Sequence, residues 1–259
     1  MAKKIIVWII IVIVLATTIF LLINNIDKSE PLYVAHQGYS SKCPGNTALS
    51  FEKAAEMPFY GIETDIRETK DGVFICNHNK DVAFKDGTKA LIKDTNYSEL
   101  MAKPLKNNTT DDDVYICRFD EYLDICKNGG KTAVIELKDD SFNEEQITRI
   151  FQIIDEHYNR KDVIFIGFDF DSICRTHNYD KSVKVQYLSS TPGDKNLSKC
   201  LDLGISIDVH FAICTASLVR KFHKKGLTVQ VWTVDNKLIK NYARRLKVDL
   251  ITSNVFYEN

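Results

Sequence analysis

Several patterns that would identify a protein class at once are missing from this chain of 259 residues. The 34 basic and 35 acidic residues nearly cancel, so no basic excess favours nucleic acid as a partner. The seven cysteines form no Cys-x-x-Cys pair and show no zinc-like spacing. No internal repeat or low-complexity segment stands out, and no glycine-rich phosphate loop follows the first predicted strand, which disfavours a dinucleotide-binding sheet.

Charge is also missing from residues 5–23, which are apolar except for Thr17 and Thr18. About 19 residues at ~1.5 Å rise nearly cross a ~30 Å hydrocarbon core. Lys3 and Lys4 precede the run and only Lys28 follows closely, so we expect the rest of the chain outside the cytoplasm. A cleaved signal peptide is the alternative, but no clear small-x-small cleavage site follows. We therefore predict a single-pass membrane anchor and linker over residues 1–30.

The exported domain predicted over residues 31–259 would hold all seven cysteines. Disulfides are permitted outside the cytoplasm, but an odd number leaves at least one thiol unpaired. Several cysteines lie in apolar contexts, which is also typical of small core residues.

Short β-type runs alternate with amphipathic helical stretches from residue 32 onward. Eight strands, mostly each followed by a helix, fit a TIM (β/α)₈ barrel in about 230 residues. A small insertion after strand 2, over about residues 73–114, breaks the rhythm, and we expect it to shape the substrate pocket. The strands are predicted at residues 32–35, 61–67, 133–137, 163–167, 183–188, 205–208, 229–234 and 249–252, and the helices at 47–57, 119–126, 144–157, 218–223 and 237–246.

The second of these strands carries Glu63 and Asp65, two residues apart. Side chains alternate along a strand, so both carboxylates point to the same face. Like charges so close repel unless a positive group lies between them, and a hard cation is their natural partner. His78 lies just past a Lys-Asp-Gly turn, and histidine is the usual side chain for proton transfer near neutral pH. The pattern suggests a metal-assisted hydrolase.

Other polar residues end strands of the predicted barrel, where catalytic groups gather. His36 ends the first strand, Glu136 lies near the end of the third with Lys138 two residues on, and Trp232 lies on the seventh. His36 alone is as easily a core histidine, Lys138 a salt-bridge partner and Trp232 a core residue. Glu136 is harder to dismiss, because a carboxylate inside a barrel strand is costly unless it is paired or metal-bound.

The order of the motifs resembles the glycerophosphodiester phosphodiesterase family. These are His-x-Gly, Asn-Thr before a helix, Glu-x-Asp, Thr-Lys-Asp-Gly, His, Glu-Leu-Lys and Val-Trp-Thr-Val, from about Tyr33 to Asn254. The resemblance implies hydrolysis of glycerophosphodiesters to glycerol phosphate and an alcohol. Attack by the neighbouring glycerol hydroxyl would first give a cyclic phosphate, which water then opens.

The resemblance also assigns roles. Glu63, Asp65 and Glu136 match the metal ligands, usually for Ca²⁺ or Mg²⁺, and His36 and His78 match the general acid and base. Lys138 would contact the phosphoryl oxygens and Trp232 would form an apolar wall near the glycerol.

Three positions depart from the family pattern and make the chain a divergent member. Gln37 stands where Arg usually contacts phosphate, Gly45 replaces the Glu before Asn-Thr, and Asn79 replaces the Asp after the second His. An amide cannot supply the charged bidentate contact of a guanidinium. Two alternatives therefore stay open: phospholipase D-like cleavage of lysolipids held in the membrane, and a non-catalytic relative that binds a phosphate ligand.

Overall fold

The computed structural model describes residues 30–139 and 141–257, and the chain from Pro31 onward forms one compact unit. Across these described residues, no helix has the length and apolar character needed to cross a membrane. The anchor predicted over residues 5–23 lies outside them.

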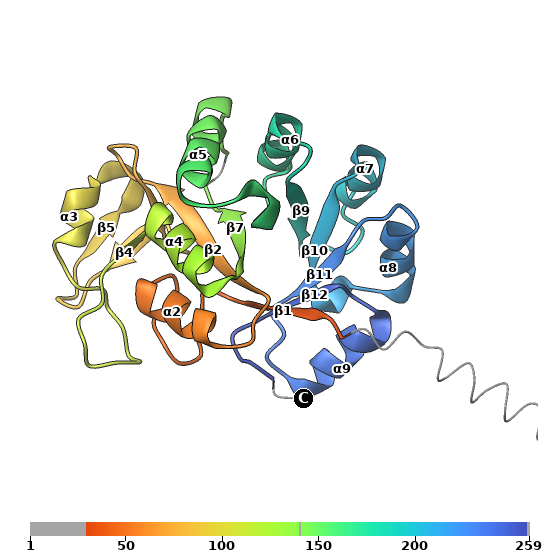
Figure 1. Ribbon diagram of the computed structural model, residues 1–259, viewed down its shortest axis with the longest axis horizontal. Coiled ribbons are helices and arrows are strands. Elements are labelled where there is room, and N and C mark those ends of the chain that lie inside the picture. Colours follow the sequence, from red (N-terminus) through yellow and green to blue (C-terminus); the bar gives the residue numbers. More distant parts are fainter. Residues whose placement is uncertain (1–29, 140, 258–259) are drawn as a thin grey trace, which may run out of the picture. The chain divides into compact units, whose positions relative to one another are not determined.

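Eight parallel strands form the barrel that the sequence predicts (Figure 1). β1 pairs with β2 on one side and with β12 on the other, which closes the sheet on itself. The strands, in chain order, are β1 (Leu32–Ala35), β2 (Gly61–Glu68), β7 (Thr132–Leu137), β8 (Val163–Gly167), β9 (Lys184–Ser189), β10 (Ser206–His210), β11 (Val229–Trp232) and β12 (Leu250–Ser253).

Helices surround the barrel (Figure 1). α5 shows why they form: Ile147, Ile150, Phe151 and Ile154 recur at helical spacing and are buried, while Asn143 caps the first turn. The helices are α2 (Ala48–Glu56), α4 (Phe119–Gly129), α5 (Glu144–His157), α6 (Phe170–Tyr179), α7 (Asn196–Leu203), α8 (Ala216–His223) and α9 (Lys237–Leu246), with 3₁₀ turns at Ile92–Asp94, Arg160–Asp162 and Phe211–Ile213.

The insertion after β2 forms a small subdomain with its own core. Its β3 pairs antiparallel with the end of β2, and Ile66 lies opposite Cys76. Its elements are β3 (Phe74–Cys76), β4 (Asp81–Ala83), β5 (Lys89–Leu91), α3 (Tyr97–Met101) and β6 (Cys117–Arg118), and its core is Ile75, Val82, Phe84, Ile92, Leu100 and Ile116. The end of β3 delivers His78 to the mouth of the barrel, because the Asn77 amide donates to the Asp65 carbonyl at 2.8 Å.

Two apolar layers hold the site in place. Inside the barrel, an apolar cluster fills the space between the strands, and two of its members, Ile166 and Leu188, also line the cavity of the site; it consists of Val34, Val134, Ile164, Ile166, Leu188 and Leu250. A larger core lies between strands and helices and includes five of the cysteines. All seven cysteines are free, and every one except the partly buried Cys174 is buried, in agreement with the core interpretation.

Candidate active site

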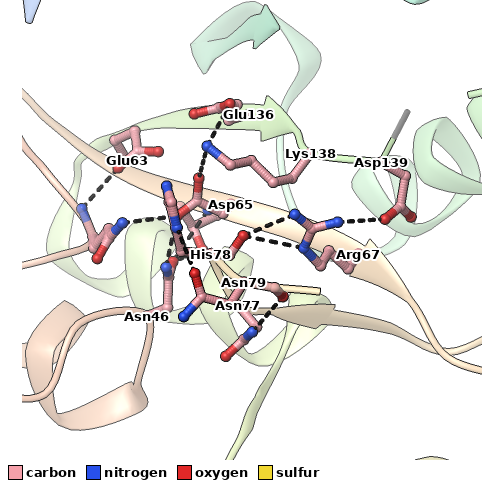
Figure 2. Close-up of polar contacts among 12 residues, drawn as sticks. Asn46, Glu63, Asp65, Arg67, Asn77, His78, Asn79, Glu136, Lys138 and Asp139 are labelled. Atoms are coloured by element: carbon pink, nitrogen blue, oxygen red, sulfur yellow. Dashed lines mark hydrogen bonds and ion pairs between the residues drawn. The ribbon is translucent and has the colours of Figure 1, made fainter. Parts of the chain in front are cut away.

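Three carboxylates meet at the carboxyl end of the barrel. Glu63 and Asp65 point inward from β2, and Glu136 lies directly beside Asp65 on β7. One oxygen from each lies within 4.8 Å of the others, and all three residues are buried (Figure 2). The alternation along β2 and the register with β7 therefore build the cluster.

The electrostatics of this cluster fit a divalent cation. Burial raises the pKa of Glu63, and repulsion from Asp65 and Glu136 raises it further. Burial and the charge of Asp65 raise the pKa of Glu136 to about 8. The buried Oε1 of Glu63 accepts no hydrogen bond among the described residues, and the buried Oδ1 of Asp65 meets only the Lys138 ammonium. Carboxylate oxygens left in this way are suitable ligands for Ca²⁺ or Mg²⁺.

Lys138 supplies part of the positive charge that offsets the repulsion among the three carboxylates. Its Nζ lies 2.8 Å from Glu136 Oε1 and 3.2 Å from Asp65 Oδ1 (Figure 2). Burial opposes ionisation of Asp65, but Lys138, the nearby histidines and the Asn46 amide outweigh it and lower the pKa of Asp65. Lys138 keeps its charge because the same carboxylates raise its pKa against the effect of burial.

His36 stands at the end of β1 with one ring nitrogen fixed. Its Nδ1 lies 2.7 Å from Asn254 Oδ1. The backbone and side-chain N–H groups of Asn254 donate in turn to the Asp235 carboxylate, which fixes the asparagine. Burial lowers the pKa of His36, so the ring is neutral at neutral pH. This arrangement leaves Nε2 free to accept a proton.

His78 faces the same cavity from the loop after β3. The Arg67 guanidinium donates to the His78 carbonyl at 2.8 Å and to Asp139 at 2.8 Å, which fixes the backbone of the histidine (Figure 2). Asn79 Oδ1 lies 3.2 Å from His78 Nδ1, so a side-chain amide holds the ring.

Two amide side chains orient the carboxylates. Asn46 donates to Asp65 Oδ2 at 2.7 Å, and its own oxygen accepts from Thr64 and from the Asp65 backbone. Gln37 donates its backbone amide to Glu63 at 2.7 Å and its side-chain amide to Asp65 at 3.0 Å. Both adopt positive φ, 58° for Asn46 and 54° for Gln37, which aims their side chains at the cluster.

A cavity of about 280 Å³ joins these groups to the far side of the barrel mouth. From β8 to β11 it is lined by apolar side chains and one carboxyl: Ile166, Phe168, Leu188, Asp208 and Trp232. The Trp232 indole donates to the Asp208 carbonyl at 3.3 Å and meets Phe168 and His210 edge-on. The eight side chains that the sequence predicts for the site all lie at this cavity or bond directly to the carboxylates that line it. The sequence assigns no role to Asn46, Asp208, Asp235 or Asn254.

The chain matches the model of the glycerophosphoryl diester phosphodiesterase family over residues 36–256. It belongs to this family. A glycerophosphodiester phosphodiesterase of Bacillus altitudinis is 25% identical over 215 residues, covering 80% of this chain and 88% of its own length. A solved Thermotoga maritima member is 26% identical, with a TM-score of 0.70, and the match covers 87% of this chain and 95% of that one.

A phosphodiesterase of Oleispira antarctica, solved with the product sn-glycerol-3-phosphate, has the same fold: 18% identity, a TM-score of 0.76, and 87% and 93% of the two chains covered. Family membership, together with the buried carboxylate cluster, assigns hydrolysis of glycerophosphodiesters to this protein. The non-catalytic alternative is thereby set aside.

Proposed function

We propose that Glu63, Asp65 and Glu136 hold one divalent cation, Ca²⁺ or Mg²⁺, at the mouth of the barrel. The observation that carries this assignment is the convergence of three buried carboxylates, one of which, Glu63, has an oxygen that accepts no hydrogen bond from the residues the structure describes. A cation bound there would supply Lewis-acid stabilisation of the negative charge that develops on the phosphoryl oxygens.

His36 is the proposed general base of the first step. Its neutral ring takes the proton of the glycerol hydroxyl next to the phosphate on Nε2, because Nδ1 is engaged by Asn254. That oxygen attacks phosphorus, a cyclic phosphate forms, and His78 gives a proton to the departing alcohol. In the second step the roles reverse as water opens the ring to glycerol phosphate.

Lys138, Gln37 and Trp232 are the proposed substrate contacts. Lys138 offers its ammonium group to the phosphoryl oxygens, and the Gln37 amide replaces the usual guanidinium. Trp232 gives the glycerol an apolar wall. We infer that Gln37, Gly45 and Asn79 make the protein a divergent member whose phosphate contact is weaker than the family's.

The proposed setting is the outer face of the cell membrane, with residues 1–30 as the anchor. The apolar run and the two lysines before it support this location. A fusion of a reporter to the C-terminus, together with proteolysis of intact cells, tests it: digestion of the domain from outside supports the proposal, and complete protection contradicts it.

The test of the site is the release of glycerol phosphate from glycerophosphocholine and glycerophosphoethanolamine, with Ca²⁺ or Mg²⁺ and with a chelator. Release that stops on chelation and returns with the cation supports the proposed metal site. Release that continues in the chelator, with no cation bound, contradicts it. Lysophosphatidylcholine, assayed in parallel, tests the phospholipase D-like alternative.

A further inference from the structure

One carboxyl in the cavity takes no part in the mechanism above. Asp208, in the middle of β10, is 1% exposed and lines the cavity together with His36, Glu63 and Lys138. It is not a member of the carboxylate cluster that fits a cation. Among the described residues its side chain has no hydrogen bond or ion pair, and its Oδ1 is fully enclosed.

A carboxyl buried without a partner destabilises the fold, since its desolvation is not compensated. The neighbouring side chains leave this carboxyl without a partner. Leu188, opposite Asp208 on β9, is apolar, and Gln230, opposite it on β11, donates its side-chain amide to Thr252. The Trp232 indole donates to the backbone carbonyl of Asp208 and not to its carboxyl. A ligand that forms the missing hydrogen bonds would account for a buried, unpartnered carboxyl at a binding site.

The position of Asp208 indicates which part of the ligand this is. In the proposed reaction the phosphorus lies among His36, His78 and Lys138, which come from the end of β1, the loop after β3 and the segment after β7 and line the cavity together. Asp208 lies across the cavity, on a wall of apolar and aromatic side chains. A short chain of carbon atoms ending in a hydroxyl fits between these two walls, because its carbons meet the apolar surface and its hydroxyl meets the carboxyl.

We propose that Asp208 hydrogen-bonds the terminal free hydroxyl of the glycerol moiety and so selects fully deacylated glycerophosphodiesters over lysolipids. The inference rests on the reaction and the site proposed above. Either protonation state of the carboxyl can make the bond, since a hydroxyl both donates and accepts. In a lysolipid acylated at the terminal carbon that hydroxyl is esterified, and Asp208 would be left buried without a partner beside an acyl chain.

The experiment pairs a change in the protein with a change in the substrate. The full-length protein is assayed with glycerophosphocholine and with the phosphocholine ester of 1,2-propanediol, which keeps the attacking hydroxyl but lacks the terminal one. We expect kcat/KM of the wild type to be about 10- to 100-fold lower for the propanediol ester, the range for one buried hydrogen bond. Lysophosphatidylcholine should be a still poorer substrate.

Variants isolate the residue. In Asp208→Leu, kcat/KM for glycerophosphocholine should fall by that same factor, whereas kcat/KM for the propanediol ester should change by less than about 3-fold. Asp208→Asn, which can still bond a hydroxyl, should keep most of the preference. Asp202→Leu, on the exposed face of α7, is the matched control and should change neither rate. The melting temperature of Asp208→Leu should equal or exceed that of the wild type, since a buried unpaired carboxyl is removed.

Equal loss on both substrates in Asp208→Leu would overturn the proposal, and so would a wild type that does not distinguish them. The second result needs no variant, so it decides the matter even if Asp208→Leu does not fold. Failure of the wild type to hydrolyse any glycerophosphodiester would instead contradict the function itself, which keeps the two failures apart.

Discussion

His36 and Asn254 lie 218 positions apart in the chain, yet their side chains meet at 2.7 Å. Because β1 pairs with β12, the residues that follow these strands are neighbours at the barrel mouth. The nitrogen of the Asn254 amide points to Asp235, so its oxygen must face His36. His36 Nδ1 therefore carries the hydrogen, and Nε2 is the basic nitrogen.

This relationship predicts the effect of Asn254→Ala. Without the acceptor the imidazole loses its fixed tautomer, and kcat should fall about 10- to 100-fold, a part of the ~10²–10⁴ that a general base contributes. KM should change little. The pH profile of kcat distinguishes this from a structural defect, since the acidic limb assigned to His36 should shift while the melting temperature holds. Ser40→Ala, which removes a second donor to the same oxygen, is the milder control.

Substitutions of Glu63 and His78 should separate metal binding from proton transfer. Glu63→Ala should abolish both tight binding of the cation and turnover, because a buried ligand is lost. His78→Ala should lower turnover at least about 100-fold and leave cation binding intact. Calorimetric titration with Ca²⁺ and Mg²⁺ measures binding, and Glu52→Ala on the exposed surface of α2 is the control. Wild-type turnover in both variants would show that the site is assigned wrongly.

The cation-free protein should lose stability as the pH rises. Folding raises the pKa of Glu136 from an ordinary 4.5 to about 8, and Glu63 shifts in the same direction. Between these values the folded state holds protons that the unfolded state has released, so the free energy of unfolding falls from about pH 4.5 to about pH 8. Thermal melts in a chelator should show this decline, and added Ca²⁺ should raise the melting temperature more at pH 8 than at pH 5.

A melting temperature in the chelator that rises or stays level from pH 5 to pH 8 would contradict this electrostatic account. Glu136→Gln is the informative variant, because it keeps the shape of the side chain and removes its titration. Its decline with pH should be shallower than that of the wild type.

Gln37 and Gly45, two positions at which the sequence resemblance indicates a departure from the family pattern, lie next to each other. A Cβ atom on Gly45 would lie 2.7 Å from Gln37 Oε1, so the absence of a side chain at 45 leaves room for Gln37. Gln37→Arg together with Gly45→Glu would introduce, as a neighbouring pair, the residues that the resemblance implies for these positions. We expect the double variant to lower KM for glycerophosphocholine about 10-fold, since the guanidinium binds phosphate by two hydrogen bonds.

The single variants test whether the pair acts together. Gln37→Arg alone places an unpaired charge near the carboxylates and should lower KM for glycerophosphocholine less than the double variant does. Gly45→Glu alone should not lower KM. Steady-state kinetics of all four proteins gives the coupling between the two positions. Additive effects would show that their contact has no role in phosphate binding.

The local features of the site follow from residues close together in the chain. The side-chain alternation in β2 places Glu63 and Asp65 on one face, and the helical spacing of apolar residues predicts α5 with the bounds observed, Glu144–His157. The alternation of strands and helices predicts the barrel, because parallel strands joined by helices close in few ways. The sequence patterns do not mark α6 or α7. α7 has eight residues and buries only Cys200, so its apolar pattern is weak.

Other features depend on closure of the barrel. Asn254 reaches His36 only because β12 lies beside β1, and Asp235, which follows β11, holds Asn254 in turn. No local pattern marks either residue as part of the site. No motif marks Asp208 in the sequence, and only the folded barrel shows that its carboxyl is buried without a partner at the cavity that Leu188 and Trp232 also line. Spacing along a chain fixes which side chains share a face, whereas hydrogen bonds between distant strands depend on how those strands pair in space.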